Sequence, residues 1–268
     1  MATDTSKHLT ALRIQNFKRF RDFELDNIGQ FNLIVGKNNT GKTSLLEALL
    51  VDEDGWVWMK TLLLALASRK DKFQKIDQIE SLKKAMNTFL YVRDKQPVIE
   101  CKFNHKTEET LFTINTWSDT FSIGNRDKES DSDYRLQDLI NKFSNNSFDV
   151  FSPFIPYGMG YGDELVDFLI KTIEQSRSKQ KRFVEGMRLF ISGMDDYRIS
   201  NGVVNLFTAQ SDEPKPLYSY GEGTNKLFRI LCTIAMAEGK KIMIDEIDAG
   251  IHYPKFKEIW KVVMLAAA

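Results

Sequence analysis

Residues 36–43 read Gly-Lys-Asn-Asn-Thr-Gly-Lys-Thr and fit the pattern G-x-x-x-x-G-K-[S/T], which constrains the fold more than any other stretch. The pattern forms a phosphate-binding loop when a strand runs into it and a helix runs out of it. The apolar run at 31–35 predicts that strand, and the apolar run at 44–50 predicts that helix. The sequence therefore predicts a nucleotide-binding α/β domain organised around this loop.

In such a loop, glycines let the main chain approach a phosphate, and successive N–H groups point at it from the helix N-terminus. Lys42 is expected to neutralise charge on the β- and γ-phosphates, so it is also a catalytic candidate, and Thr43 is expected to ligate Mg²⁺. The expected nucleotide contacts are Gly36, Asn38, Asn39, Thr40, Gly41, Lys42, Thr43 and Ser44.

A basic turn precedes the loop. Residues 9–16 and 20–27 alternate apolar and polar side chains, as half-buried strands do. Between them lies Asn16-Phe17-Lys18-Arg19-Phe20. Asn16 and Lys18 of this turn are candidates to reach the phosphates or base of a nucleotide, and a solvated hairpin tip is the alternative.

A second glycine-rich loop, Ser219-Tyr220-Gly221-Glu222-Gly223-Thr224, precedes an apolar helix predicted at 227–237. A glycine-rich loop at a helix N-terminus is a second anion site. Between the two loops, a Pro-bearing turn is expected at 212–216, and two helices at about 163–176 and 180–193 carry a basic cluster. That cluster is either a solvated helix face or a contact for DNA or a partner.

The run Lys240-Lys241-Ile242-Met243-Ile244 ends in Asp245 and Glu246. A short continuous apolar run suits a buried parallel strand, whose carboxyl end opens onto the ligand crevice. Asp245 is expected to bind Mg²⁺ through water, and Glu246 to orient or deprotonate the attacking water. Glu246 and Lys42 are therefore the predicted catalytic residues.

The order of phosphate loop, Ser-x-Gly-Glu loop and Ile-Met-Ile-Asp-Glu resembles the ABC-type ATPase heads of the RecF, SMC and OLD-nuclease group. Within that group the sequences of these motifs are most similar to those of ATPases of bacterial anti-phage operons, including the ATPase component of PARIS-type systems. Segments 12–50, 151–156 and 218–254 carry the resemblance, which covers roughly a third of the chain. It implies ATP and Mg²⁺ as ligands.

The resemblance also implies that two heads sandwich two nucleotides. Ser219, Gly221, Glu222 and Gly223 would then act across a homodimer interface or a higher even-numbered assembly, and Asp248 and His252 would belong to the loop that links the two sites. A core or capping histidine is the alternative for His252. A separate nuclease-like effector is the implied partner, and DNA is a possible one.

Two features of the group are not found. The group carries a histidine at the end of the strand after the Asp-Glu strand, and the sequence to Ala268 stops in the helix predicted from about Pro254. A glutamine for the usual Mg²⁺-contacting loop is also missing, because the turn at 156–162 has none. An ATP-loaded scaffold with little turnover is therefore an alternative to an ATP-hydrolysing switch, and a RecF-like DNA-repair ATPase is another.

The expected fold class is α/β: an ABC-type P-loop NTPase head with a mixed core sheet, an antiparallel β subdomain and a helical insert. The expected divisions are an N-terminal lobe at 1–125, the helical insert at 126–200 and the C-terminal part of the ATPase core at 201–268. The antiparallel strands are predicted at 98–103, 110–116 and 120–123, a loop at 124–133 and a short helix at 134–143.

Composition is that of an ordinary globular protein, with 42% hydrophobic and 28% charged residues. Lys plus Arg and Asp plus Glu both number 37, so no overall charge points to nucleic acid or membrane. The longest uncharged apolar run is far too short to span a bilayer, and no signal peptide is recognised at the start of the sequence, so a cytoplasmic location is expected. Cys101 and Cys232 lack the spacing of a metal or redox pair.

Overall fold

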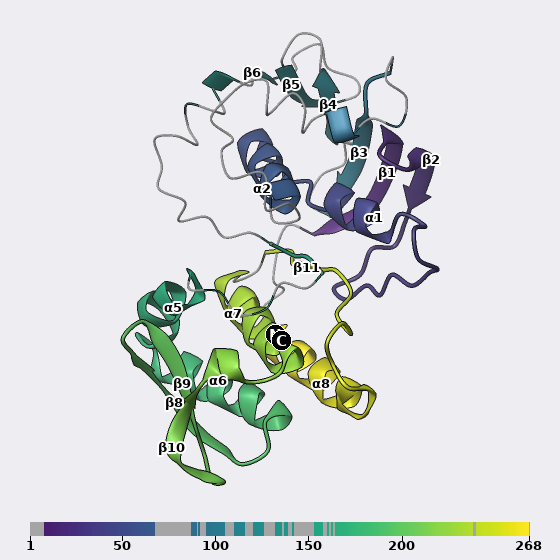
Figure 1. Ribbon diagram of the computed structural model, residues 1–268. Coiled ribbons are helices and arrows are strands. Elements are labelled where there is room, and N and C mark those ends of the chain that lie inside the picture. The colour runs from purple at the N-terminus through teal and green to yellow at the C-terminus, as the bar shows by residue number, and fades with distance from the viewer. Residues whose placement is uncertain are drawn as a thin grey trace. The chain divides into compact units, whose positions relative to one another are not determined.

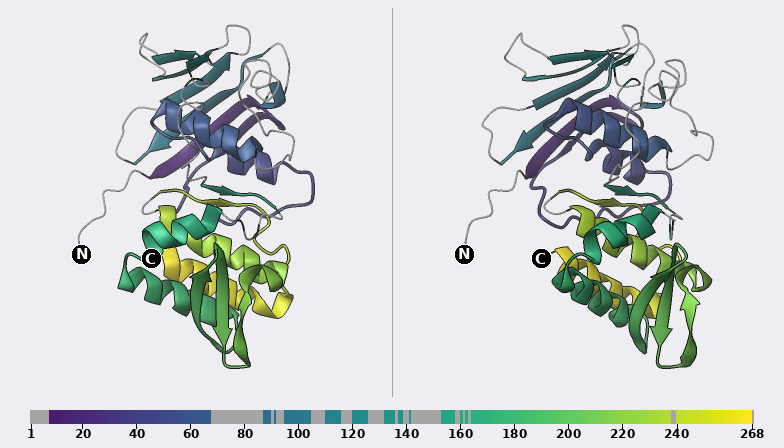
Figure 2. Two further views of the ribbon diagram at one scale, coloured as in Figure 1. Left: turned by 60° about the vertical axis from the view of Figure 1, so that its left-hand side comes forward. Right: turned by 90° about the vertical axis from the view of Figure 1, so that its left-hand side faces the viewer.

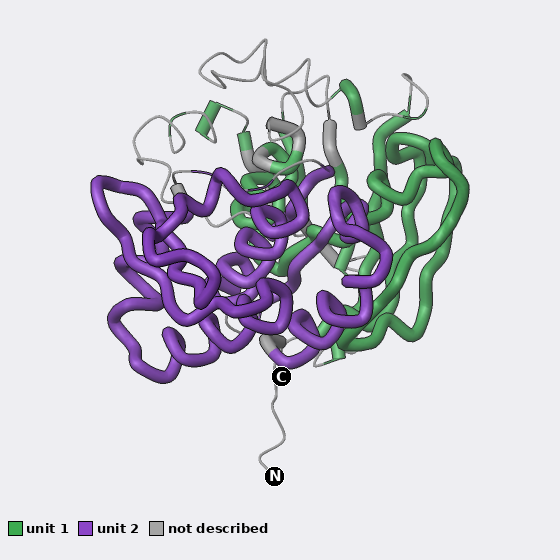
Figure 3. The backbone as a smooth tube through the Cα atoms, turned by 60° about the horizontal axis from the view of Figure 1, so that its bottom comes forward, with its two compact units in different colours: residues 1–150 green, residues 151–268 purple. Residues whose placement is uncertain are grey.

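The computed structural model describes residues 8–67, 87–89, 91, 95–104, 110–115, 120–125, 132–135, 137–138, 141, 153–157, 160, 162, 164–237 and 240–267. The chain forms two compact units, residues 1–150 (unit 1) and 151–268 (unit 2), which Figure 3 distinguishes by colour. Mixed α/β structure is confirmed, and each unit is described by itself. Among the described residues, no helix has the length and apolar character needed to cross a membrane.

Unit 1 contains a six-stranded sheet with the strand order β2-β1-β3-β4-β5-β6, in which every neighbouring pair is antiparallel. Among the described residues, the helices α1 and α2 and a short 3₁₀ turn accompany the sheet in this unit (Figure 1). The elements are β1 (Leu9–Phe17), β2 (Phe20–Leu25), α1 (Lys42–Ala48), α2 (Gly55–Ala67), η1 (Asn87–Phe89), β3 (Val98–Phe103), β4 (Thr110–Asn115), β5 (Thr120–Asn125) and β6 (Ser132–Arg135).

Helix α2 lies against one face of this sheet (Figure 2). The Trp58 ring packs 4.7 Å from Phe112 and 6.4 Å from Phe121, centroid to centroid, and all three side chains are fully buried. Phe112 belongs to β4 and Phe121 to β5, so these aromatic contacts fix the helix on the middle of the sheet. Each of these aromatic side chains buries a large apolar area, and the rest of the core of unit 1 is mainly aliphatic.

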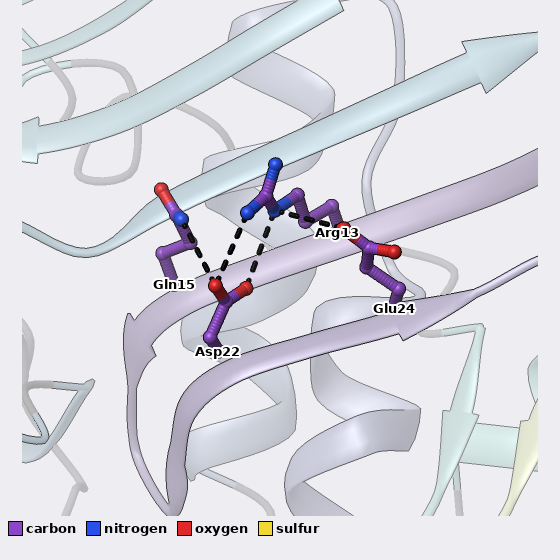
Figure 4. A network of polar contacts seen from close by, with 4 residues as sticks. All are labelled: Arg13, Gln15, Asp22 and Glu24. Carbon is purple, nitrogen blue, oxygen red and sulfur yellow. Dashed lines mark hydrogen bonds and ion pairs between the residues drawn. The ribbon is translucent and has the colours of Figure 1, made fainter.

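Arg13 sets the register of the β1–β2 hairpin (Figure 4). Its guanidinium donates to the two carboxylate oxygens of Asp22 at 3.2 and 3.1 Å and lies 3.2 Å from Glu24. Gln15 donates to the same Asp22 at 3.4 Å. The hydrogen bond and charge of Asp22 raise the pKa of Arg13, and the Arg13 hydrogen bond lowers the pKa of Asp22. This exposed network joins the two strands of the hairpin, and exposed ion pairs of this kind contribute little to stability.

Unit 2 combines helices with a three-stranded antiparallel sheet, β10-β9-β8, and a parallel two-stranded pair, β11-β7. Its elements are β7 (Phe154–Ile155), α5 (Glu164–Phe168), the π-helical turn η2 (Leu169–Ile173), α6 (Arg177–Phe190), β8 (Met194–Ser200), β9 (Val203–Thr208), β10 (Ser211–Pro216), η3 (Leu217–Ser219), α7 (Glu222–Ala237), β11 (Met243–Ile244), η4 (Tyr253–Lys255) and α8 (Phe256–Ala267).

One apolar core joins α6, α7 and α8. Phe183 of α6 packs edge-on against Phe228 of α7, with 5.5 Å between ring centroids. Gly186 lets the same two helices approach closely, since a Cβ there would lie 3.2 Å from both methyl groups of Leu231. The helices expected in an insert at 126–200 thus share their core with the helix that follows the second glycine-rich loop.

Several sequence predictions are wrong. No strand forms at 31–35: Phe31, Leu33 and Val35 are exposed, and an apolar run becomes a strand only where a neighbour completes its hydrogen bonds. The Pro-bearing segment 212–216 is part of strand β10 at a sheet edge, where proline is tolerated. The helix predicted at 134–143 begins too early: Tyr134 and Arg135 belong to β6, which pairs with β5, whereas residues 137, 138 and 141 are helical.

The core of unit 2 gives a matched test. Leu231→Ala removes a 4% exposed side chain packed on Gly186, whereas Leu189→Ala removes a 41% exposed one from α6. We expect Leu231→Ala to lower the free energy of unfolding by about 2–5 kcal/mol because it leaves a cavity. Leu189→Ala should change it by about 0.5 kcal/mol or less. Urea denaturation followed by circular dichroism measures both, and equal effects would contradict the packing described here.

Candidate functional site

The phosphate loop of unit 1 is followed by a helix, as its sequence predicts, but the strand predicted before it does not form. Helix α1 begins at Lys42, directly after the loop, and the residues from Gly36 to Thr40 are exposed. Asn39 and Gly41 have positive φ angles of 66° and 101°. A Cβ at Gly41 would lie 3.2 Å from Cζ of Phe20, so both the backbone angle and the space favour glycine there.

Lys42 folds back over its own loop. Its ammonium donates to the carbonyl oxygens of Gly36 at 2.8 Å and Lys37 at 2.9 Å. Thr40 Oγ1 donates to the same Lys37 carbonyl at 2.8 Å. Lys42, the residue predicted to bind phosphate, therefore has main-chain oxygen partners that phosphate oxygens can replace. Thr43 and Ser44 follow in the first turn of α1, where main-chain N–H groups have no partner within the helix.

Arg19 is a residue of this site that the sequence analysis missed. Its guanidinium donates twice to Asn39, to the main-chain oxygen at 2.7 Å and to Oδ1 at 2.6 Å. Paired hydrogen bonds from one guanidinium fix both distance and orientation. Arg19 thus clamps the left-handed residue of the phosphate loop. Its position beside Lys18 in the basic turn was the sequence signal that could have identified Arg19.

Lys18 and Asn16, the residues chosen from that turn, have structural partners. The Lys18 ammonium is paired with the carboxylate of Glu47 on α1, and the two side chains are 11% and 0% exposed. Asn16 donates from Nδ2 to the carbonyl of Lys95, and its own carbonyl accepts from the N–H of Tyr91 at 3.1 Å. These contacts attach the basic turn to α1 and to the segment before β3.

In unit 2, the predicted acidic pair follows a parallel strand. Residues 243 and 244 pair in parallel with 154 and 155, and Asp245 N–H donates to the carbonyl of Ile155 at 2.8 Å. The parallel pairing is as predicted, although the strand is half-buried instead of fully buried. Asp245 is 7% exposed, and Glu246 is exposed with a positive φ of 46°.

The second glycine-rich loop is shorter than predicted, because helix α7 begins at Glu222. Ser219 ends the short helix η3 and donates from Oγ to the carbonyl of Pro216 at 2.7 Å. Glu222 and Gly223 lie in the first turn of α7 instead of in the loop. Ser219, Gly221 and Glu222 lie together at this end of α7.

The turn after the acidic pair lies against the start of α7. A Cβ at Gly223 would stand 2.7 Å from the carbonyl oxygen of Gly250, so the backbones meet where only glycine fits. Asp248 and His252 are exposed in this turn. His252 is therefore not a core histidine, and its side chain makes no capping hydrogen bond to η4. The start of α7 at Glu222 and Gly223 therefore packs directly against the turn at 248–252.

Lys226 lies one turn further along α7. It is 3% exposed, and its ammonium donates to the carbonyl oxygens of Asp245, at 3.3 Å, and Glu246. Burial lowers the pKa of Lys226, and the carboxylates of Asp248, Glu246 and Asp245 oppose that shift. The sequence analysis missed this residue as well, because a lysine in an apolar helix reads as solvent-facing.

Similarities to known proteins include an ATPase family model that covers the phosphate loop. The family model described as AAA ATPase domain matches residues 8–152, which is more than half of the 268-residue chain. The chain therefore belongs to this family of P-loop ATPases. The ATP/GTP phosphatase of Helicobacter pylori is 23% identical over 295 residues, which cover 94% of this chain and 79% of that protein.

Two shorter similarities concern parts of the chain. An uncharacterized protein of Methanocaldococcus jannaschii is 49% identical over 41 residues, 15% of this chain and 19% of that protein. The DNA replication and repair protein RecF of an Exiguobacterium species is 43% identical over 44 residues, 16% of this chain and 12% of that protein. The match to RecF supports the group of RecF- and SMC-like ATPases.

The buried pair between Lys18 and Glu47 gives a test of the role of Lys18. Lys18→Met leaves the fully buried Glu47 carboxylate without its cation, and we expect the free energy of unfolding to fall by about 3–5 kcal/mol. The control Lys102→Met, on an exposed lysine of β3, should change it by about 0.5 kcal/mol or less. Urea denaturation measures both. Unchanged stability with weaker ATP binding would instead assign Lys18 to the nucleotide.

Proposed function

We propose that this protein binds and hydrolyses ATP, with the phosphate loop at 36–43 holding the phosphates and Asp245 and Glu246 supplying the hydrolytic groups. The phosphate loop carries the proposal: Asn39 and Gly41 have left-handed backbones, and α1 begins at the cation Lys42. Membership in an ATPase family, and a relative named ATP/GTP phosphatase, support turnover.

Lys42 is already surrounded by oxygen acceptors at 2.8 and 2.9 Å, so exchanging them for β- and γ-phosphate oxygens needs no new burial of charge. The Thr43 hydroxyl and the Asp245 carboxylate are oxygen ligands of the kind that Mg²⁺ prefers, and they fit this ion. When bound, Mg²⁺ neutralises charge on the phosphates. Asp245 is anchored for this task by its N–H bond to β7.

Glu246 is the group proposed to orient the attacking water and accept its proton. It directly follows Asp245, and its exposed carboxylate remains accessible to water. A positioned general base typically contributes about 10²–10⁴-fold to a rate. Because Asp245 and Glu246 are adjacent, the metal ligand and the base would be delivered to a nucleotide together.

We further propose a homodimer, or a higher even-numbered assembly, that closes around ATP. The resemblance to ABC-type heads implies that Ser219, Gly221 and Glu222 meet the nucleotide of a second copy. We call residues 219–221, which precede α7, the serine loop. The close approach of Gly223 to Gly250 supports the proposal, because it brings the start of α7, next to the serine loop, against the turn with Asp248 and His252. Binding of ATP would thus join two copies, and hydrolysis would release them.

Glu246→Gln tests hydrolysis and dimerisation together. We expect turnover to fall about 10²–10⁴-fold while ATP binding is kept, because the amide cannot accept the proton. The variant should then accumulate as an ATP-bound dimer, seen by light scattering after gel filtration. Lys42→Ala is the control and should lose both binding and dimer. A Glu246→Gln protein that stays monomeric in ATP and keeps wild-type turnover would contradict the proposal.

The resemblance to ATPases of anti-phage operons leads us to propose that the nucleotide state controls a separate nuclease-like effector. In the alternative, an ATP-loaded scaffold, the protein would hold its effector and hydrolyse little. Phosphate release measured with and without phage proteins or DNA separates the two. Stimulated turnover supports the switch, whereas stable ATP occupancy without release supports the scaffold.

The match to RecF favours a DNA-repair ATPase as a second candidate function. Helix α6 exposes Arg177, Lys181, Arg182 and Arg188, which could contact phosphates. Under this reading the protein should bind duplex DNA at low salt, with an affinity that falls steeply as salt rises because counterions are released. Fluorescence anisotropy over a salt series measures this, and no binding at low salt would remove this candidate.

A further inference from the structure

The first two turns of helix α7 carry polar side chains that bind main-chain carbonyl oxygens of separate loops. Asn225 donates from Nδ2 to the carbonyls of Tyr220 at 2.7 Å and Gly221 at 3.2 Å. Lys226 donates to the carbonyls of Asp245 and Glu246, and Arg229 donates to the carbonyl of Gly160. One helix therefore holds the serine loop, the turn that begins with Asp245 and Glu246 (the acidic turn) and Gly160.

Lys226 makes the contact with the greatest consequence for chemistry. A buried ammonium is costly unless hydrogen bonds compensate for the loss of water. At 3% exposure, Lys226 recovers part of that cost from the carbonyls of Asp245 and Glu246. The Glu246 carbonyl also accepts from the N–H of Ala249 at 2.9 Å. Two donors thus converge on one carbonyl of the acidic turn.

Glu246 needs such support because its backbone is unusual. Its φ of 46° lies in the left-handed region, which a glutamate rarely adopts. Such a conformation persists only when the surrounding structure holds it. If the Glu246 carbonyl were released, the residue could relax to an ordinary backbone conformation, and its carboxylate would move away from its place beside Asp245.

Helix α7 also reaches the predicted dimer surface. It begins at Glu222, and Gly223 meets the carbonyl of Gly250 with no room for a Cβ. Lys226 lies one turn further along the same helix. A displacement of the serine loop therefore reaches the acidic turn by two routes, through the contact at Gly250 and through the ammonium of Lys226.

We propose that Lys226 is a positioning residue that locks the left-handed turn at Glu246 and couples engagement of the loop 219–223 to the placement of the Glu246 carboxylate. The coupling to turnover rests on the proposed function. The locking of the turn does not, so the two parts are tested separately.

Hydrogen–deuterium exchange tests the locking without any activity. In Lys226→Met, the amides of Ala249 and Ile251, which bond back to Glu246 and Asp248, should exchange about tenfold faster or more. Amides of α1 and the phosphate loop should be unchanged. The matched control Lys181→Met removes a 78% exposed lysine and should alter neither region. Unchanged exchange at 249–251 in Lys226→Met would overturn the proposal.

Steady-state kinetics test the coupling. Lys226→Met should keep its ATP affinity within about twofold and lose about 10–100-fold in kcat, because a small misplacement of a reacting group is costly. Lys226→Arg retains the cation and its donors and should recover most of kcat and the slow exchange. A loss of ATP affinity at unchanged kcat, or a loss of exchange protection throughout unit 2, would reduce Lys226 to a stabilising residue.

The exchange measurement remains decisive if the protein does not hydrolyse ATP or if Lys226→Met does not fold. A wild-type protein that binds ATP but does not hydrolyse it would refute the proposed hydrolysis, while the exchange measurement would still decide whether Lys226 locks the turn. If Lys226→Met does not fold, Lys226→Gln, which keeps one donor, replaces it. Faster exchange at 249–251 alone would then support the locking, and wild-type exchange there would overturn it.

Discussion

The candidate loops of both units depend on main-chain carbonyl oxygens that accept hydrogen bonds from cationic side chains. In unit 1, Arg19 holds the carbonyl of Asn39, and Lys42 holds two carbonyls of its own loop. In unit 2, Lys226 holds the carbonyls at the acidic turn, and Arg229 holds Gly160. A loop cannot pair its carbonyls as a strand does, so side chains must satisfy them. Charged donors do so more strongly than neutral ones.

Lys42 and Lys226 differ in whether their carbonyl partners can be exchanged for a ligand. Lys42 is bound to carbonyls of an exposed loop, where a phosphate can displace them without exposing a buried charge. Lys226 is buried, and moving its ammonium would remove the hydrogen bonds that compensate for its burial. The same chemical contact is therefore exposed and replaceable in unit 1 but buried in unit 2. This difference explains why one lysine is read as a phosphate ligand and the other as a positioning residue.

The sequence predicted the parts of the structure that local patterns determine. The helix after the phosphate motif, the alternating strands β1 and β2, and the parallel strand before Asp245 all lie close to where they were expected. The strand at 31–35 was wrong because an apolar run does not reveal whether a neighbour exists to pair with it. Arg19 and Lys226 were missed for a related reason: a cation bound to a distant carbonyl leaves no spacing signal, since every residue supplies that acceptor.

Residues with positive φ angles occur at the candidate sites of both units. Six non-glycine residues among those described have positive φ, and four belong to candidate site positions: Asn16, Lys18, Asn39 and Glu246. Each of these four has a charged or amide contact that holds it, such as Arg19 on Asn39 and Lys226 on Glu246. Another, Asn201, lies in an Asn-Gly turn between β8 and β9, where asparagine adopts this conformation at little cost. Lysine and glutamate have no such tolerance, so their left-handed conformations are explained only by the partners that hold them. Strain of this kind, maintained by a specific hydrogen bond, is a better guide to the working parts of this protein than the identity of the strained residue.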